Sequence, residues 1–142
     1  MTRNMMAQWN ALQRKLAGVD GPPAPGEAGT WHPSTDVYDG PDGLIVKVEL
    51  GGVPCDDIQI YLQDRALVVE GMRRDPHTAE SLAGLRLRQM EIEYGPFQRV
   101  IPLPYPVDGR RALAHCAGGM LEIRLPRAET LVRRRVTIVL SQ

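Results

Sequence analysis

The chain has 142 residues, and its 17 acidic residues balance 17 basic ones, so the formal net charge is zero. This length accommodates one domain with tails, and a zero net charge argues against strong nonspecific attraction to nucleic acid or to an anionic membrane. No apolar run approaches the roughly 20 residues that span a bilayer, and the N-terminus lacks the apolar core of a signal peptide. We therefore expect a soluble, cytoplasmic protein.

Near the N-terminus, four apolar side chains fall at helical spacing. Met5, Trp9, Leu12 and Leu16 follow one another at intervals of four, three and four residues, which predicts one apolar stripe on a short helix. Two interpretations remain open: the helix packs on the chain's own core, or it forms an adaptable surface for apolar partners, as Met and Trp side chains can. The run that follows is rich in Pro and Gly and predicts a linker, so residues 1–30 form an arm.

From Trp31 onward the apolar residues alternate with polar ones, which is the period of a β-strand. Residues 44–50, 57–63 and 66–71 follow this pattern and predict three strands separated by turns. Residues 73–85 are polar and irregular, and they predict a long loop.

Residues 86–93 alternate again, although neither face of this predicted strand is clearly apolar. A strand without a face to bury in its own sheet is a candidate for pairing with another chain. The next predicted strand carries Phe97, Arg99, Ile101 and Leu103 on one face. Because a single Arg on an apolar face needs a charged or carbonyl partner, we expect Arg99 to have one.

The last part of the chain predicts a hairpin and an apolar tail. Residues 112–125 form the hairpin, because Gly118 and Gly119 accept the positive φ of a tight turn. After Pro126 the chain is charged and then apolar, and three apolar side chains on a free terminus would favour aggregation. We expect these three to be buried: Val136, Ile138 and Leu140. The groove that buries them is expected to be edged by Ile58, Ile60, Leu62, Leu113 and His115.

The sequence offers little for catalysis or for binding a cofactor or metal. No serine lies in a G-x-S-x-G context, no glycine-rich phosphate loop is visible, and the three histidines lack zinc-type spacing. His115 and Cys116 are neighbours on a predicted strand and point to opposite faces. Cys55 and Cys116 form no disulfide framework, which favours a reducing compartment, with Cys116 as a small buried hydrophobic residue. The basic run 133–135 favours a solubilising spacer over a nucleic-acid site.

Four ordered blocks over residues 31–140 resemble the small heat shock proteins, whose shared module is the alpha-crystallin domain. They include I-x-v-x-v-e-d-n-x-L-x-i-x-G, y-G-x-F-x-R-x-x-x-L-P and A-x-x-x-n-G-x-L. Two positions depart from the family pattern, because Gly51 replaces a proline and Gly118 replaces a polar residue. The matching residues are Trp31, Pro33, Asp36, Val37, Tyr38, Leu50, Gly52, Val53, Ile58, Ile60, Leu62, Asp64, Leu67, Val69, Gly71, Tyr94, Gly95, Phe97, Arg99, Leu103, Pro104, Ala114, Gly119 and Leu121.

Pattern and resemblance together predict an all-β fold, an immunoglobulin-like antiparallel β-sandwich. The sandwich is predicted over residues 31–126, preceded by the helical arm 1–30 and followed by an extended C-terminal tail, 127–142. Because the preceding loop is long and the strand 86–92 lacks a clear face to bury in its own sheet, we also predict a homodimer formed by exchange of this strand, which assembles into larger oligomers. The dimer contact would include Arg99, Leu87 and Met90.

The function that the resemblance implies is that of an ATP-independent chaperone, a holdase that captures unfolding client proteins without a cofactor. Client binding would fall to the arm residues Met5, Met6, Trp9, Leu12 and Leu16. Family tails end in an I-x-I/V motif that docks on a neighbouring subunit. Either Val136 with Ile138 or Ile138 with Leu140 fits this motif, and the first pair is preferred because it follows the basic run.

Three other classes of protein are considered. A co-chaperone of the CS-domain type shares the sandwich but is not expected to carry the apolar tail or the long strand-bearing loop. A purely structural sandwich would assemble without protecting clients. An enzyme would need a polar cleft with perturbed carboxylates. An aggregation assay without nucleotide separates the holdase from these alternatives.

Overall fold

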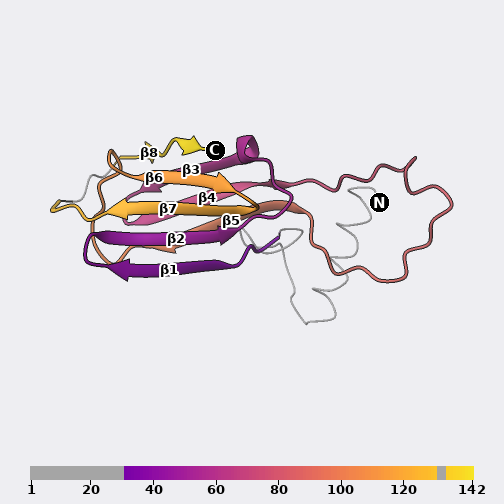
Figure 1. Cartoon of the computed structure of the whole chain (residues 1–142), viewed down its shortest axis with the longest axis horizontal. Coiled ribbons are helices and arrows are strands. Elements are labelled where there is room, and N and C mark those ends of the chain that lie inside the picture. Colours follow the sequence, from indigo (N-terminus) through magenta and orange to yellow (C-terminus); the bar gives the residue numbers. More distant parts are fainter. Residues whose placement is uncertain (1–30, 131–133) are drawn as a thin grey trace.

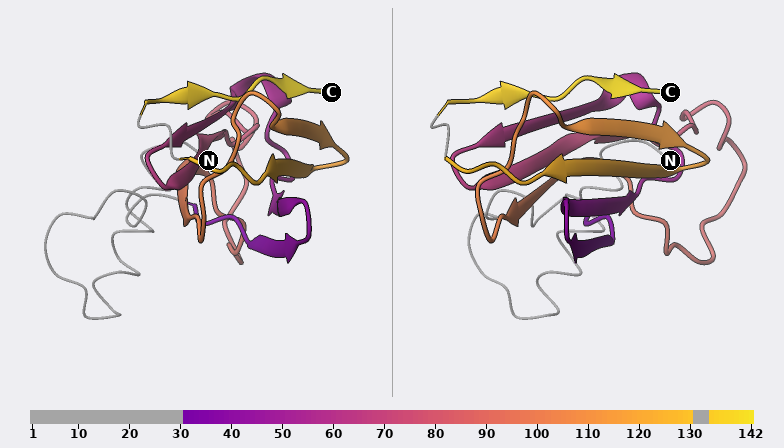
Figure 2. Two further views of the ribbon diagram at one scale, coloured as in Figure 1. Left: turned by 90° about the vertical axis from the view of Figure 1, so that its left-hand side faces the viewer. Right: turned by 60° about the vertical axis from the view of Figure 1, so that its left-hand side comes forward.

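The computed structural model describes residues 31–130 and 134–142, and these form two β-sheets packed face to face (Figures 1 and 2). The predicted all-β sandwich is confirmed. The predicted N-terminal helix falls within residues 1–30 and lies outside the described residues. No helix in the described ranges is long and apolar enough to cross a membrane.

The first sheet has five strands in the order β1-β2-β7-β6-β9, and all neighbours are antiparallel except β6 and β9. Their bounds are β1 Thr35–Gly40, β2 Gly43–Glu49, β7 Met120–Pro126, β6 Leu113–Ala117 and β9 Leu140–Ser141.

The second sheet has four antiparallel strands in the order β5-β4-β3-β8. Their bounds are β5 Gly95–Pro102, β4 Ala66–Arg73, β3 Ile58–Gln63 and β8 Val136–Thr137, and a 3-10 turn, η1 Cys55–Asp57, leads into β3. The two short strands β8 and β9 come from the predicted tail, so this tail contributes one strand to each sheet.

The core lies between the sheets and is made of the alternating apolar residues of the predicted strands. Val46 of β2 is paired with Ile123 of β7, and Val48 with Leu121, and none of these four side chains is exposed to solvent. Burying each such side chain contributes about 1.5–3 kcal/mol of folding free energy before the entropic costs. The hairpin between β6 and β7 turns at Gly118 and Gly119, whose φ values of 59° and 78° agree with the predicted Gly-Gly turn.

The predicted strand 86–93 is not a strand in the structure. These residues belong to an extended loop, 74–94, that joins β4 to β5 and projects from one end of the sandwich (Figure 1). Leu87 is 50% exposed and Ile92 is 61% exposed. The prediction of a strand is therefore wrong for the single chain. The described chain places no strand beside this segment with which it could form a ladder.

The expectation that the two cysteines are separate thiols is also wrong. Cys55 and Cys116 form a disulfide, with their Cα atoms 6.1 Å apart, and neither is free. Cys116 is buried as expected, with 6% of its surface exposed. Sequence spacing could not reveal the pair, because 61 residues separate the two positions and only the packing of the two sheets brings them together.

Candidate functional site

The C-terminal tail closes one side of the sandwich by crossing from one sheet to the other (Figure 2). Val136 pairs with Leu62 of β3, and Leu140 pairs with Ala114 of β6. Between these strands the backbone N–H of Ile138 donates a hydrogen bond to the carbonyl of Ile60, at 2.9 Å. The tail therefore completes the hydrogen-bonding edge of both sheets within the same chain.

The side chains of the tail alternate between the core and solvent. Ile138 is 4% exposed and belongs to the core, Val136 and Leu140 are partly buried against it, and Val139 is 85% exposed. Ile138 belongs to both predicted motif pairs, so both registers include this buried residue.

The tail lies against β3 and β6. The groove residues predicted on β3 are buried, whereas those predicted on β6 are exposed. On β3, Ile60 is 1% exposed, and its neighbours two positions away, Ile58 and Leu62, are also buried. On β6, by contrast, Leu113 is 67% exposed and His115 is also exposed.

The residues of β6 that face the core are Ala114 and Cys116, which are 4% and 6% exposed. The structure thus places Leu113 and His115 on the opposite face of β6 from the apolar side of the tail. Alternation across the Gly-Gly turn was the signal that could have found this face, because Ala114 pairs with buried Ile123. His115 contacts the tail only at its rim, where Nδ1 lies 3.4 Å from Ser141 Oγ.

Polar and cation–π contacts flank the apolar part of the tail, residues 136–140, on both sides. Arg135 places its guanidinium carbon 3.7 Å from the centre of the Tyr61 ring, a cation–π arrangement. At the other end Ser141 Oγ donates to the carbonyl of Ala114 at 2.9 Å, and Gln142 Nε2 donates to Asp56 Oδ1 at 3.2 Å. Such contacts select one orientation of the tail in an otherwise apolar groove.

The opposite side of the sandwich, formed by β1 and β5, carries no added strand among the described residues. In the described chain β1 pairs only with β2, and β5 pairs only with β4. Val37 and Tyr38 of β1 are 47% and 51% exposed, and Val100 of β5 is 55% exposed. These two strands leave edge N–H and C=O groups available to another strand.

Arg99 of β5 lies on this open side and has the carbonyl partner that its sequence context requires. Its Nη1 donates to the carbonyl of Pro33 at 3.1 Å and lies 3.3 Å from Nδ1 of His32. Because Pro33 leads into β1, Arg99 connects the two sheets. The other two predicted dimer residues lie on the projecting loop, where Leu87 is exposed and Met90 is partly buried.

Arg73 anchors both ends of the projecting loop, and sequence reasoning had assigned it only to the start of that loop. Its guanidinium stacks 3.5 Å from the centre of the Trp31 ring. Nε donates to the carbonyl of Glu93 at 2.7 Å, Nη2 also reaches that carbonyl, and Nη1 donates to Gly51 at 3.3 Å. Burial lowers the pKa of Arg73 from its usual value, and nearby Tyr94 and Glu93 oppose this shift. The sequence carries no local signal for this role, because Trp31 and Glu93 both lie far from Arg73 along the chain.

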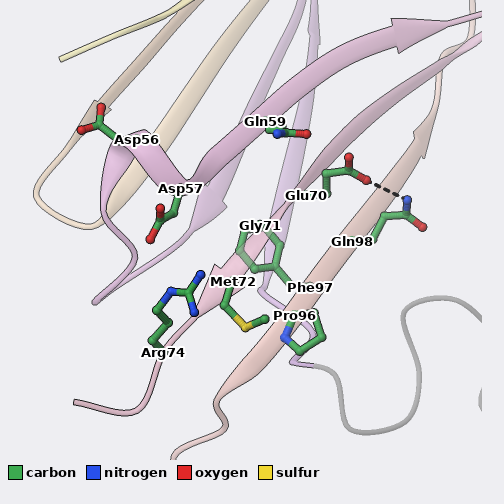
Figure 3. Close-up of a pocket in the computed structure, with 10 residues that line it drawn as sticks. All are labelled: Asp56, Asp57, Gln59, Glu70, Gly71, Met72, Arg74, Pro96, Phe97 and Gln98. Carbon is green, nitrogen blue, oxygen red and sulfur yellow. Dashed lines mark hydrogen bonds between the residues drawn. The ribbon is translucent and has the colours of Figure 1, made fainter.

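A polar hollow lies at the start of β3, beside β4 and β5 (Figure 3). Its lining includes Asp56, Asp57, Glu70, Arg74 and Gln98, and Glu70 accepts a hydrogen bond from Gln98 Nε2 at 3.0 Å. Within residues 31–130 and 134–142, no group of three or more His, Cys, Asp or Glu residues could hold a metal ion.

Comparison with known proteins places these features in a family. The model of the Hsp20/alpha crystallin family matches residues 36–139. Heat shock protein 16 of Schizosaccharomyces pombe is 35% identical over 101 residues, which is 71% of this chain and 70% of that protein.

Similar solved structures include two that are at least 30% identical to this chain. Heat shock protein 16.0 from Schizosaccharomyces pombe has a TM-score of 0.63 and 34% identity, covering 70% of this chain and 89% of that one. A small heat-shock protein from Xylella fastidiosa, described as having a distinct high order structure, has a TM-score of 0.58 and 30% identity, covering 73% of this chain and 94% of that one. The chain belongs to the Hsp20/alpha crystallin family, the small heat shock proteins, whose members are chaperones rather than enzymes.

Proposed function

We propose that this protein is an ATP-independent holdase that binds unfolding proteins and prevents their aggregation. The observation that carries the proposal is the family match, which extends through the sandwich and into the tail, over residues 36–139. A folded sandwich with a filled core has no interior space for a client segment. Clients therefore bind to surfaces outside this core.

The N-terminal arm is the segment proposed to bind clients. Its residues lie outside the described part of the chain, so the proposal is supported by the sequence pattern alone. The Met, Trp and Leu side chains at helical spacing offer soft apolar surface to client segments of varied shape. These residues are Met5, Met6, Trp9, Leu12 and Leu16.

An aggregation assay tests the holdase function. A heat-sensitive client is warmed alone and with the protein at near-equal subunit ratios, and light scattering is followed with and without ATP. We expect scattering to fall to the same extent in both conditions. Suppression that appears only with ATP would contradict the proposal, and an assembled protein that leaves scattering unchanged would favour the purely structural alternative.

A variant of the arm separates client binding from folding. Replacing Met5, Trp9, Leu12 and Leu16 with Ser should reduce client protection strongly and change the Tm of the sandwich little, because the Pro- and Gly-rich linker separates the two parts. Val139→Ser, at a side chain that is 85% exposed, is the matched control and should leave protection intact. A large loss of Tm with protection retained would show that the helix packs on the core.

The subunit is proposed to dimerise by exchanging residues 86–92 with a partner. Three features support this proposal: the segment alternates like a strand, it lies on a projecting loop, and β1 has a free edge in the described chain. Strand addition to an exposed edge supplies main-chain hydrogen bonds. The edge of β1 is the favoured acceptor, because five of its six residues are exposed.

The C-terminal tail is proposed to link dimers into larger oligomers in the cytoplasm. In the single chain the tail occupies its own groove, and the same contacts are available to the tail of a neighbouring subunit. Each buried aliphatic side chain contributes about 1.5–3 kcal/mol before ordering costs, so docking is firm yet reversible. In a cytosolic protein the Cys55–Cys116 bond would be transient, because disulfides there are usually catalytic or redox-sensing.

A further inference from the structure

The disulfide joins β6 to the turn that leads into β3, and the tail binds between these two strands. Cys55 lies in η1, directly before β3, and Cys116 lies on β6. These two strands belong to different sheets, so no backbone ladder connects them to each other. In the described chain the tail, core packing and the disulfide are what hold β3 and β6 at a fixed separation.

The last residues of the tail lie beside the disulfide. Leu140 pairs with Ala114, two positions before Cys116 on β6. Gln142 donates to the carboxylate of Asp56, the residue that follows Cys55. Leu140 and Cys55 also both pack against the core cluster that contains Cys116 and Ile138. The last residues of the tail therefore contact residues close to both cysteines.

We propose that Cys55 and Cys116 form a redox-sensitive clamp on the tail groove. In the disulfide form the clamp holds β3 and β6 at the separation that accepts the tail. In the dithiol form this constraint is lost and the tail dissociates more readily. The inference deepens the proposed function by giving the tail-mediated assembly a regulator, but it does not depend on client binding.

The chemistry of the clamp is thiol–disulfide exchange with a dithiol reductant. Cys55 is partly exposed and Cys116 is buried, so the reductant thiolate attacks the sulfur of Cys55. The Cys55–Cys116 bond breaks, Cys116 leaves as a thiolate and takes up a proton, and a mixed disulfide remains on Cys55. The second thiol of the reductant then displaces Cys55, so the protein gains two electrons and two protons and the reductant becomes a cyclic disulfide.

The coupling between clamp and tail acts in both directions. If the disulfide favours the docked tail, the docked tail must favour the disulfide by the same factor, as thermodynamic linkage requires. A variant that weakens docking, Ile138→Ser, should therefore shift the thiol–disulfide equilibrium toward the dithiol form. This shift is measured by equilibrating the full chain with mixtures of reduced and oxidised dithiothreitol and counting the free thiols.

Hydrogen exchange of the full-length protein, with and without dithiothreitol, tests the clamp. Exchange of the Ile138 amide, which is bonded to Ile60 in the docked tail, should become about tenfold faster on reduction. Cys55→Ser should exchange at the fast rate in both conditions. Core amides of β2 and β7, such as Val46, should be unaffected.

Three results would overturn the inference: two free thiols after equilibration with excess oxidised dithiothreitol, equal exchange of Ile138 in both redox states, or a parallel acceleration of the core amides. The last would show that the disulfide stabilises the whole sandwich and has no particular effect on the tail. Failure of the protein to protect a client refutes the proposed function alone, since none of these measurements contains a client.

Discussion

The two lateral sides of the sandwich differ in whether their edge strands are paired with a further segment of the described chain. On the side of β3 and β6 the chain's own tail crosses the gap, Ile138 is 4% exposed, and a disulfide joins the two sheets. On the side of β1 and β5 the described chain adds no strand, and the hydrogen bond from Arg99 to the carbonyl of Pro33 connects the sheets. One side is completed by the chain itself, and the other keeps free strand edges in the described residues.

This difference shows how one sandwich can support two kinds of assembly. A free edge such as β1 accepts a strand from outside and suits a lasting contact through many main-chain hydrogen bonds. A groove that already holds a segment of the same chain must first release it, so any contact made there competes with the chain's own tail. We therefore expect the open side to form the stable dimer and the closed side to form the exchangeable contacts between dimers.

Removing the projecting loop should have the largest effect, because it removes the strand proposed to fill the open side. Replacing residues 74–92 with Asn-Gly retains Arg73 and Glu93, which hold the base of the loop. We expect a folded monomer by sedimentation at concentrations where the parent is a dimer. A control that shortens only residues 77–83 should still dimerise. Dimers of undiminished affinity in the first variant would rule out strand exchange.

Substitution in the tail tests the closed side. Ile138→Ser removes a side chain that is 4% exposed, and loss of a large aliphatic side chain from a core costs about 2–5 kcal/mol when the site cannot collapse. The tail can dissociate from the groove and so avoid leaving a cavity. We therefore expect a loss of unfolding free energy near the lower end of this range, together with dissociation of larger assemblies into dimers. Urea unfolding and sedimentation measure the two effects.

Three neighbouring substitutions accompany Ile138→Ser. Leu140→Ser should act more weakly than Val136→Ser if the pair Val136 and Ile138 forms the docking motif. Val139→Ser should have no effect because that side chain is 85% exposed. A stronger effect at Leu140 than at Val136 would select the second register. A parent protein that sediments as a dimer at every concentration would refute the proposed larger oligomers.

Replacing Arg99 should have the smallest effect of these changes on folding. Arg99→Met loses the hydrogen bond to Pro33, and a hydrogen bond of a partly exposed side chain contributes about 1 kcal/mol. We expect a loss of this order in urea unfolding and a weaker dimer on dilution. Arg124→Met is the matched control, since the Arg124 side chain is 62% exposed and its partner among the described residues is Glu122, on the same strand. Equal effects at the two positions would leave Arg99 without a special role on the open side.

Much of the fold could be predicted from the sequence because its determinants are local. The alternation around Val46 and Ile123 predicted which faces of β2 and β7 are buried, since side chains on a strand alternate with a period of two. The Gly118–Gly119 turn was predicted because few other dipeptides adopt two consecutive positive φ values at low cost. The need of Arg99 for a carbonyl partner also followed from its position on an apolar face.

The remaining features depended on which distant segments meet, and only the tertiary structure decided them. The pairing of Cys55 with Cys116 and the role of Arg73 at the loop base both join segments that lie far apart in the sequence. Residues 86–92 have the alternation of a strand, yet a strand needs a neighbour to satisfy its backbone groups, and the described part of the chain places none beside them. Alternation is a property of one segment, whereas a ladder, a disulfide or a groove is a property of two, and their meeting is decided by the packing of the whole sandwich.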